Sequence, residues 1–284
     1  MSPLGCSNIH VLLKFATMPA DATRTQLFGI FVLANRPLTA SQVVALSKPL
    51  GISATNVKSH LTRLVAEGSL DRSGPRRRAR YSPATDQRDL VAGLAARLDS
   101  HSEAWDGRWI MLVLHGPSSR SGRRALRQSL WFDGFRPSGA DTYLRPAWPE
   151  RWALERARVY LAERSGLCVH GTLVGNLDLR RVAKMYDLDV LDREAGRLAR
   201  TIIAKSRGNG SAAEAFAARL DVGGRVARLV AHDPRLPQGI WASRTGLRDL
   251  RRAYRRFETH IGPAADRFLQ EVLEPRQPRQ TESR

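Results

Sequence analysis

The segment LTASQVVALSKPLGISATNVKSHLTRLVAEGSLDRSGPRRRARY, residues 38–81, contains the signals of two helices followed by a hairpin. Thr39 is a residue type that caps helices, and apolar residues at positions 43, 44 and 46 follow it. Pro49 and Gly51 then end this first helix, because proline cannot continue a helix and glycine tolerates a tight turn.

A second helix is predicted over about 54–67, between Ser53, which can cap it, and Gly68, which ends it. Val57, Leu61 and Leu64 recur at spacings of four and three, so they form one buried stripe. The opposite face mixes small hydrogen-bonding side chains with cations: Thr55, Asn56, Lys58, Ser59, Thr62 and Arg63. This composition suits the DNA major groove, since base edges require donors and acceptors and phosphates require positive charge.

A strand–turn–strand pattern follows, with strands at 69–72 and 76–81 joined by Ser73-Gly74-Pro75. Its tip carries four arginines, Arg76, Arg77, Arg78 and Arg80, which we expect to contact the DNA backbone or minor groove. Two helices and such a hairpin predict a winged helix-turn-helix, with DNA contacts from Ser53, the polar face of the second helix and the four arginines. The alternative is a helix pair in an unrelated helical domain, with an ordinary solvated basic face.

The net charge of +19 favours a polyanionic partner. Only five of the 46 basic residues are lysine, so the arginine excess has GC-rich coding as an alternative origin. Local clustering is more informative than the total. Within residues 53–80, seven basic residues are accompanied only by Glu67 and Asp71, which gives this stretch a net charge of +5.

The sequence predicts a cytoplasmic protein. Its two cysteines, Cys6 and Cys168, suit a reducing compartment and are too few for a metal framework. The apolar run 9–18 is interrupted by Lys14 and lacks a basic leader, so a secretory signal is not expected. No apolar run approaches membrane-spanning length, and no membrane partner is expected.

The remaining sequence predicts an α+β protein with two further domains. Residues 105–184 show the order strand, helix, strand, strand, helix, strand, which is that of a ferredoxin-like α/β sandwich. Its first strand is the continuous apolar run 109–114, expected to be buried on both faces. The expected boundaries are 20–85 for the winged helix-turn-helix, 86–104 for a linker helix, 105–184 for the central domain, 185–274 for a helical C-terminal domain and 275–284 for a flexible tail.

Four stretches of the chain resemble the PaaX family of bacterial transcriptional repressors. They are NVKSHLTRLVAEGSL at 56–70, WDGRW at 105–109, LWFDGF at 130–135, and DPRLP at 233–237 followed by Trp241 and residues 250–257. Their order matches that of the family, whose recognition helix, central domain and C-terminal domain they resemble.

The resemblance implies a homodimeric repressor of catabolic genes that binds double-stranded DNA at an inverted-repeat operator. It also implies release from DNA by an aromatic acyl-coenzyme A such as phenylacetyl-CoA. The implied central fold is that of a CRISPR adaptation nuclease subunit, which holds a metal through an aspartate after its first strand. His115-Gly116-Pro117 stands there instead, so nuclease activity is not expected.

Other chemistry finds little support. There is no phosphate-binding glycine loop, no serine-nucleophile motif and no His/Cys metal spacing, so neither a cofactor nor an enzyme is expected. Asp187, Asp189 and Asp192 are interpreted as a solvated helix start. The exposed set Arg120, Arg123, Arg124 and Arg127 can contact DNA, hold ligand phosphates or face water, and the last is favoured. Trp152, Tyr160 and Trp241 are candidates for effector contacts, with a place in the core as the alternative for each, and the effector site is unknown. A nonspecific DNA- or RNA-binding protein and an unrecognised enzyme remain the alternatives.

Overall fold

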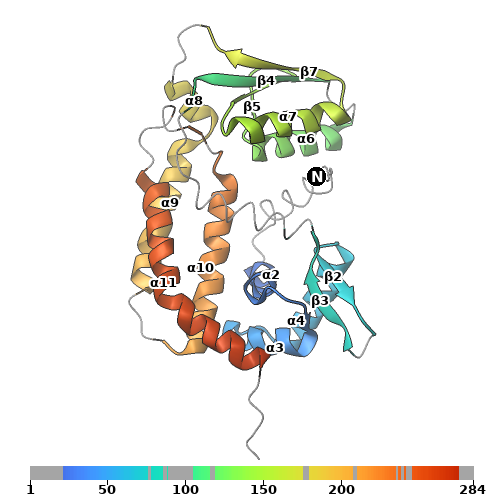
Figure 1. The fold of residues 1–284 in the computed structure, drawn as a ribbon, viewed down its shortest axis with the longest axis vertical. Helices are drawn as coiled ribbons and strands as arrows, with labels where there is room; N and C mark the ends of the chain where they lie inside the picture. The colour runs from blue at the N-terminus through green and yellow to red at the C-terminus, as the bar shows by residue number, and fades with distance from the viewer. Residues whose placement is uncertain are drawn as a thin grey trace, which may run out of the picture. The chain divides into compact units, whose positions relative to one another are not determined.

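The computed structural model describes residues 22–75, 78–85, 88, 105–115, 119–174, 179–206, 210–234, 236–237, 240 and 245–274. The protein is an α+β protein with two small antiparallel sheets (Figure 1). The chain divides into two compact units. The central unit contains the described residues between 92 and 197 and between 227 and 250, and the terminal unit contains those between 19 and 91, between 198 and 226, and after 250.

The first part of the terminal unit contains the elements predicted from residues 38–81, preceded by one helix. Its elements are α2 (Ala22–Ala34), β1 (Leu38–Thr39), α3 (Ala40–Ser47), the 3-10 turn η1 (Lys48–Leu50), α4 (Ala54–Ala66), β2 (Leu70–Ser73) and β3 (Arg80–Pro83). The sheet has the order β1-β3-β2, and all neighbours are antiparallel. Both predicted helices and the predicted hairpin are therefore present, and β1 adds a third strand that the sequence did not reveal. The second strand of the hairpin begins at Arg80, four residues later than predicted.

Local side-chain chemistry sets the limits of these helices. Thr39 caps α3 as predicted, and Gln42 completes a capping box by accepting the backbone N–H of Thr39 at 2.9 Å. Gly51 adopts φ 71° after η1, a left-handed conformation that glycine adopts without steric cost. Val57, Leu61 and Leu64 of α4 are buried, as their spacing predicts.

The C-terminal helices are α9 (Leu188–Lys205), α10 (Ala212–His232) and α11 (Thr245–Leu273). In the terminal unit, α10 lies close to α2, because a Cβ placed on Gly29 would be 2.8 Å from Leu220 Cδ2. Arg219 of α10 donates to Glu258 at 2.9 Å and to Asp266 at 2.7 Å, which ties α10 to α11. Of the helical domain expected at 185–274, the described residues at 185–197 and 227–250 group with the central unit. Those at 198–226 and from 251 onward group with the terminal unit.

The central unit has one four-stranded antiparallel sheet with two helices on one face. Its elements are β4 (Arg108–Leu114), α6 (Arg120–Phe132), β5 (Arg136–Pro137), β6 (Thr142–Pro146), α7 (Glu150–Glu163), β7 (Gly166–Thr172) and α8 (Leu179–Met185). The strand order is β5-β6-β4-β7. This is the predicted succession of elements.

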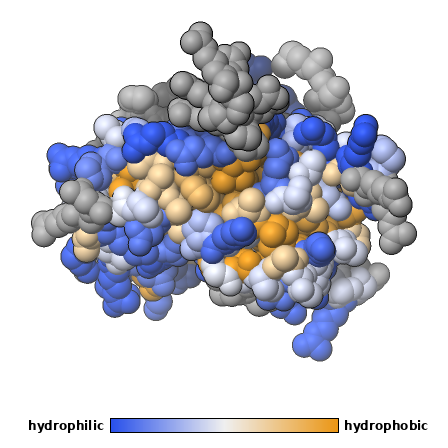
Figure 2. Space-filling view, turned by 90° about the horizontal axis from the view of Figure 1, so that it is seen from below, coloured by the Kyte–Doolittle hydropathy of each residue, from blue (hydrophilic) through white to orange (hydrophobic). Residues whose placement is uncertain are grey.

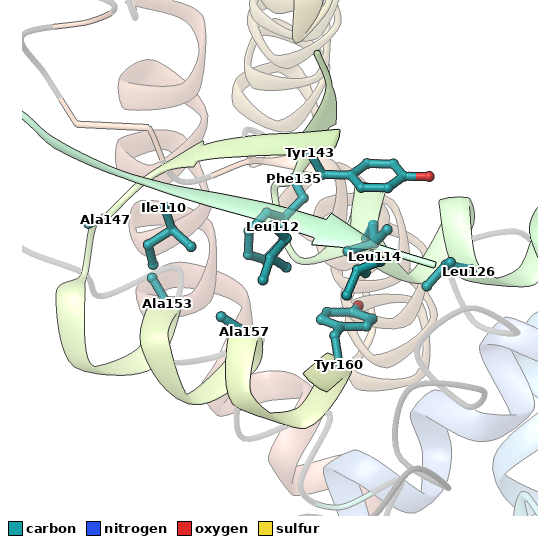
Figure 3. Packing of buried hydrophobic residues seen from close by; sticks show 11 residues of the cluster. Ile110, Leu112, Leu114, Leu126, Phe135, Tyr143, Ala147, Ala153, Ala157 and Tyr160 are labelled. Atoms are coloured by element: carbon teal, nitrogen blue, oxygen red, sulfur yellow. The ribbon is translucent and has the colours of Figure 1, made fainter. Parts of the chain in front are cut away.

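One face of this sheet forms the core of the central unit. Ile110, Leu112 and Leu114 of β4 are fully buried and point towards the side of α7 that carries Ala153, Ala157 and Tyr160 (Figure 3). Small alanines let the helix approach the strand closely. The prediction that β4 is buried on both faces was wrong, because Met111 and Val113, which alternate with these residues, are only half-buried.

Two arginines are buried where the sequence suggests exposed charge. Arg145 is 1% exposed and donates to the carbonyl oxygens of Asp133, Pro146 and Trp148. Arg136 is 2% exposed and lies 4.6 Å from the ring centroids of both Trp131 and Tyr186. Burial lowers the pKa of Arg136 to about 10. These side chains bind backbone carbonyls and aromatic rings, so their role is to hold the α6–β5 junction.

The expected linker helix 86–104, the apolar run 9–18 and the tail 275–284 lie almost entirely outside the described residues. Among the helices that the structure does describe, none combines the length and the apolar character needed to cross a bilayer.

Candidate nucleic-acid interface

The candidate interface is built on α4, whose two faces differ in chemistry. The inner face packs through its three buried apolar residues, and the outer face exposes every polar residue that the sequence singled out. These exposed residues are Thr55, Asn56, Lys58, Ser59, Thr62 and Arg63. Because they stand on one rigid helix, their relative positions are fixed by the helix geometry.

The start of α4 is set by Ser53, whose hydroxyl accepts the backbone N–H of Asn56 at 3.3 Å. Ser53 therefore has a capping role, and it is itself exposed. The first turn contains no acidic residue, so the positive end of the helix dipole is not neutralised there. Such a helix start favours a phosphate or another anion.

Farther along α4, Thr62 uses its hydroxyl within the helix, donating to the carbonyl oxygen of Lys58 at 3.1 Å. Lys58 itself is exposed, and its charge is free to reach a phosphate. Of the candidate residues on α4, Thr62 is thus the one whose hydroxyl hydrogen is already engaged.

The end of α4 is anchored to α2. Glu67, which follows the last helical residue, forms an ion pair with Arg24 of α2, whose side chain is largely buried. Gly68 then adopts φ 69°, and the N–H of Ser69 donates to the carbonyl oxygen of Leu64 at 2.8 Å. This pattern closes the helix and turns the chain into β2. Sequence reasoning missed Arg24, because nothing in the local pattern pairs it with a residue 43 positions away.

Two of the four predicted hairpin arginines are described by the structure, and they make different hydrogen bonds. Arg78 is exposed, and its backbone N–H donates to the carbonyl oxygen of Pro75 at 2.8 Å across the turn. Arg80 is also exposed, but its guanidinium donates to the carbonyl oxygen of Pro37 at 3.3 Å, so it also fastens β3 to the loop before β1. Arg76 and Arg77 lie outside the described residues.

An additional exposed cation, Arg72, lies on β2 directly opposite Tyr81 of β3. The sequence showed that it belongs to the hairpin, but only the strand register shows which residue it faces. Figure 2 looks onto the lower end of Figure 1, where hydrophilic residues lie around the margin and hydrophobic residues gather towards the middle.

The effector candidates have structural partners. Tyr160 is 2% exposed and donates to the Asp133 carboxylate at 2.8 Å, and burial raises the pKa of its hydroxyl well above the ordinary range. Trp152 is half-buried against the Arg145 guanidinium, which lies 4.6 Å from its ring centroid. Trp241 lies outside the described residues.

Carboxylates and metal-binding residues form no further site in the described part of the chain. No group of three His, Cys, Asp or Glu side chains there is arranged to hold a metal ion.

The interpretation of Asp192 as part of a solvated helix start was wrong. It is half-buried, and its carboxylate accepts the backbone N–H groups of Gly246 at 2.9 Å and Leu247 at 3.4 Å, which caps α11.

Comparisons with known proteins bear on the fold alone. No protein-family model matches the chain, and no curated protein matches it. Among solved structures, the chain is similar to the uncharacterized protein Rv0674 from Mycobacterium tuberculosis, with 19% sequence identity and a TM-score of 0.53. The similarity covers 93% of this chain and 98% of that one, so the two share their fold over most of their lengths.

Proposed function

We propose that the protein is a sequence-specific DNA-binding transcriptional regulator, with the terminal unit acting as a winged helix-turn-helix. The observation that carries the proposal is the outer face of α4, which exposes hydrogen-bonding side chains and cations beside an arginine-bearing hairpin. The order of two helices, then a hairpin with β1 completing a small sheet, further supports it.

The residues divide into two roles. Thr55, Asn56 and Ser59 stand in the first two turns of α4 and, with Arg63, read base edges in the major groove. Lys58 and the hairpin arginines neutralise phosphates, which supplies affinity without sequence information. Ser53 contributes by starting the helix at the right residue, and Thr62 by its exposed position beside Lys58.

The central unit acts, on this proposal, as a ferredoxin-like domain that pairs two copies of the chain. The strand order β5-β6-β4-β7 with antiparallel neighbours supports the fold assignment. The strand register places Met111 opposite Val169 and Val113 opposite Leu167. Leu167 and Val169 are 51% and 46% exposed. Two copies of a chain of net charge +19 can share such an uncharged face without bringing like charges together.

A homodimer presents two α4 helices to DNA, so the operator is expected to be an inverted repeat with half-sites about one or more helical turns apart. Repression of a catabolic operon, relieved by an aromatic acyl-CoA such as phenylacetyl-CoA, is the part of the proposal that rests on the resemblance to the PaaX family.

Protection of DNA from cleavage tests the proposal. The full chain, added to the DNA upstream of its own gene, is expected to protect two symmetry-related segments, and phenylacetyl-CoA is expected to remove the protection. Uniform protection along every fragment would favour a nonspecific nucleic-acid-binding protein instead. Protection that persists with the acyl-CoA would retain the regulator and remove this effector.

A further inference from the structure

A stripe of arginines runs along the exposed face of α6 in the central unit. Arg120, Arg123, Arg124 and Arg127 recur at spacings of three and four, so they share one side of the helix, and all are exposed. Leu126 and Leu130 on the other side are buried in the core of the unit. The stripe spans about 10 Å, at about 1.5 Å of helix rise per residue.

This arrangement of arginines is electrostatically unfavourable for the helix. Like charges at spacings of three and four repel each other, and cations in the first turns face the positive end of the helix dipole. The sequence RSGRRALRQSLWF of α6 contains no acidic residue that would offset this. Violations of local rules of this kind are typical of functional surfaces.

Two arginines on another helix of the central unit, in contrast, form ion pairs with carboxylates. On α7, Arg151 pairs with Glu155 at 3.4 Å and Arg156 pairs with Asp133 at 2.8 Å. Within the described part of the chain, no carboxylate forms an ion pair with Arg120, Arg124 or Arg127. The guanidinium groups of Arg120, Arg124 and Arg127 are therefore available to an anion from outside.

The four side chains also line a hollow of about 460 Å³. That volume is within the range of about 300–1,000 Å³ in which proteins bind small molecules. A single phosphate group is too small to meet guanidinium groups spread along two helical turns, whereas linked phosphates can accept bidentate hydrogen bonds from several of them. A hollow also suits a compact anion better than the extended backbone of a duplex.

We propose that the arginine face of α6 binds a compact polyphosphate group, such as the linked phosphates of a nucleotide-like ligand, in the hollow lined by Arg120, Arg123, Arg124 and Arg127. The four described residues that line the hollow all belong to α6 of the central unit, and the site does not depend on DNA binding by the terminal unit. If tripolyphosphate does not bind, the proposed recognition of DNA by α4 is unaffected. If DNA does not bind, the proposed polyphosphate site is unaffected.

Calorimetric titration of the full chain with inorganic tripolyphosphate, at about 0.15 M ionic strength, tests this site. We expect one site per chain and a loss of affinity of about tenfold or more in R124A/R127A. The control R248A/R252A removes two exposed arginines that lie four positions apart on α11. It is expected to change the affinity for tripolyphosphate by less than about twofold. R124K/R127K keeps the charge but loses the bidentate geometry, and intermediate affinity is expected.

Three results would overturn the proposal. They are absence of tripolyphosphate binding to the unmodified chain, an equal loss of affinity in the control and α6 variants, and weaker duplex binding by R124A/R127A with unchanged tripolyphosphate binding. The last result would assign the stripe to the DNA backbone. Thermal unfolding of each variant checks that these exposed substitutions leave the fold intact.

Discussion

The hydroxyl of Ser53 accepts a hydrogen bond from the backbone N–H of Asn56 at 3.3 Å, which sets the first turn of α4. The side chain of Asn56 is thereby left exposed in that turn. The N-terminal residues of a recognition helix are the ones that contact base edges, and an asparagine amide can pair with adenine through two hydrogen bonds. This relationship makes Asn56 the sharpest test of sequence recognition.

Replacing Asn56 by alanine is expected to weaken binding to the operator by roughly 1–3 kcal/mol, through loss of a paired base contact. Binding to random DNA is expected to stay unchanged, as measured by fluorescence anisotropy on both duplexes. Gln270→Ala, which removes an exposed amide from α11, serves as the control. An equal loss on both duplexes would show that Asn56 does not read sequence.

Arg78→Ala is expected to weaken binding similarly on all DNA sequences, because Arg78 is an exposed hairpin cation. The slope of log affinity against log salt concentration should become shallower by about 1, the value for one lost phosphate contact. Replacing Arg76, Arg77 and Arg78 together should flatten the slope further. A slope identical to that of the unmodified protein would remove the hairpin from the interface.

Thr39→Ala is expected to lower the free energy of unfolding by about 1 kcal/mol, the usual cost of losing a helix N-cap. The Thr39 side chain accepts the N–H of Gln42 at 3.3 Å, and Gln42 reciprocates. Thr39→Ser retains the hydroxyl and should lose much less. Urea unfolding of the three proteins makes the comparison, and equal stability of all three would contradict the capping role.

The raised pKa of Tyr186 predicts that the protein loses stability at alkaline pH. Burial raises the pKa of its hydroxyl to about 12, against an ordinary value of 10.0, and the hydroxyl donates to the carbonyl oxygen of Gly134 at 2.9 Å. Between these two values the unfolded chain releases the proton and the folded chain keeps it. The contribution of the Tyr186 hydroxyl to the free energy of unfolding is therefore fully present below pH 10 and is lost as the pH rises to about 12. This loss amounts to roughly 2–3 kcal/mol.

Urea unfolding at intervals from pH 9 to 12 measures this effect. Tyr186→Phe, which has no hydroxyl to ionise, is expected to show a smaller fall in stability over the same range. Parallel curves for the two proteins would mean that Tyr186 titrates normally.

Local signals predicted the elements that depend on neighbouring residues. The caps at Thr39 and Ser53 and the spacing of Val57, Leu61 and Leu64 placed α3 and α4 almost to the residue. The apolar run of β4 placed the first strand of the central sheet in the same way. Each of these features is decided within a few residues of the chain.

Features that depend on distant partners could not be predicted. Arg145 is buried because carbonyl oxygens of three separate residues converge on its guanidinium, whereas arginine in a sequence suggests exposure. Asp192 caps a helix that begins 53 residues later, at Thr245. The close approach of α10 to Gly29 could not be predicted from the sequence either, since it depends on a residue far away in the chain. In the candidate interface, the exposed face of α4 was predictable, but its anchoring through Arg24 was not.

The most direct test of the proposed DNA recognition is an anisotropy titration of the full chain with the DNA upstream of its own gene and with a scrambled duplex. At about 0.15 M ionic strength, a regulator of this kind is expected to prefer its operator by about 10³-fold or more. Equal and weak binding to the two duplexes would contradict sequence-specific recognition of that DNA by α4.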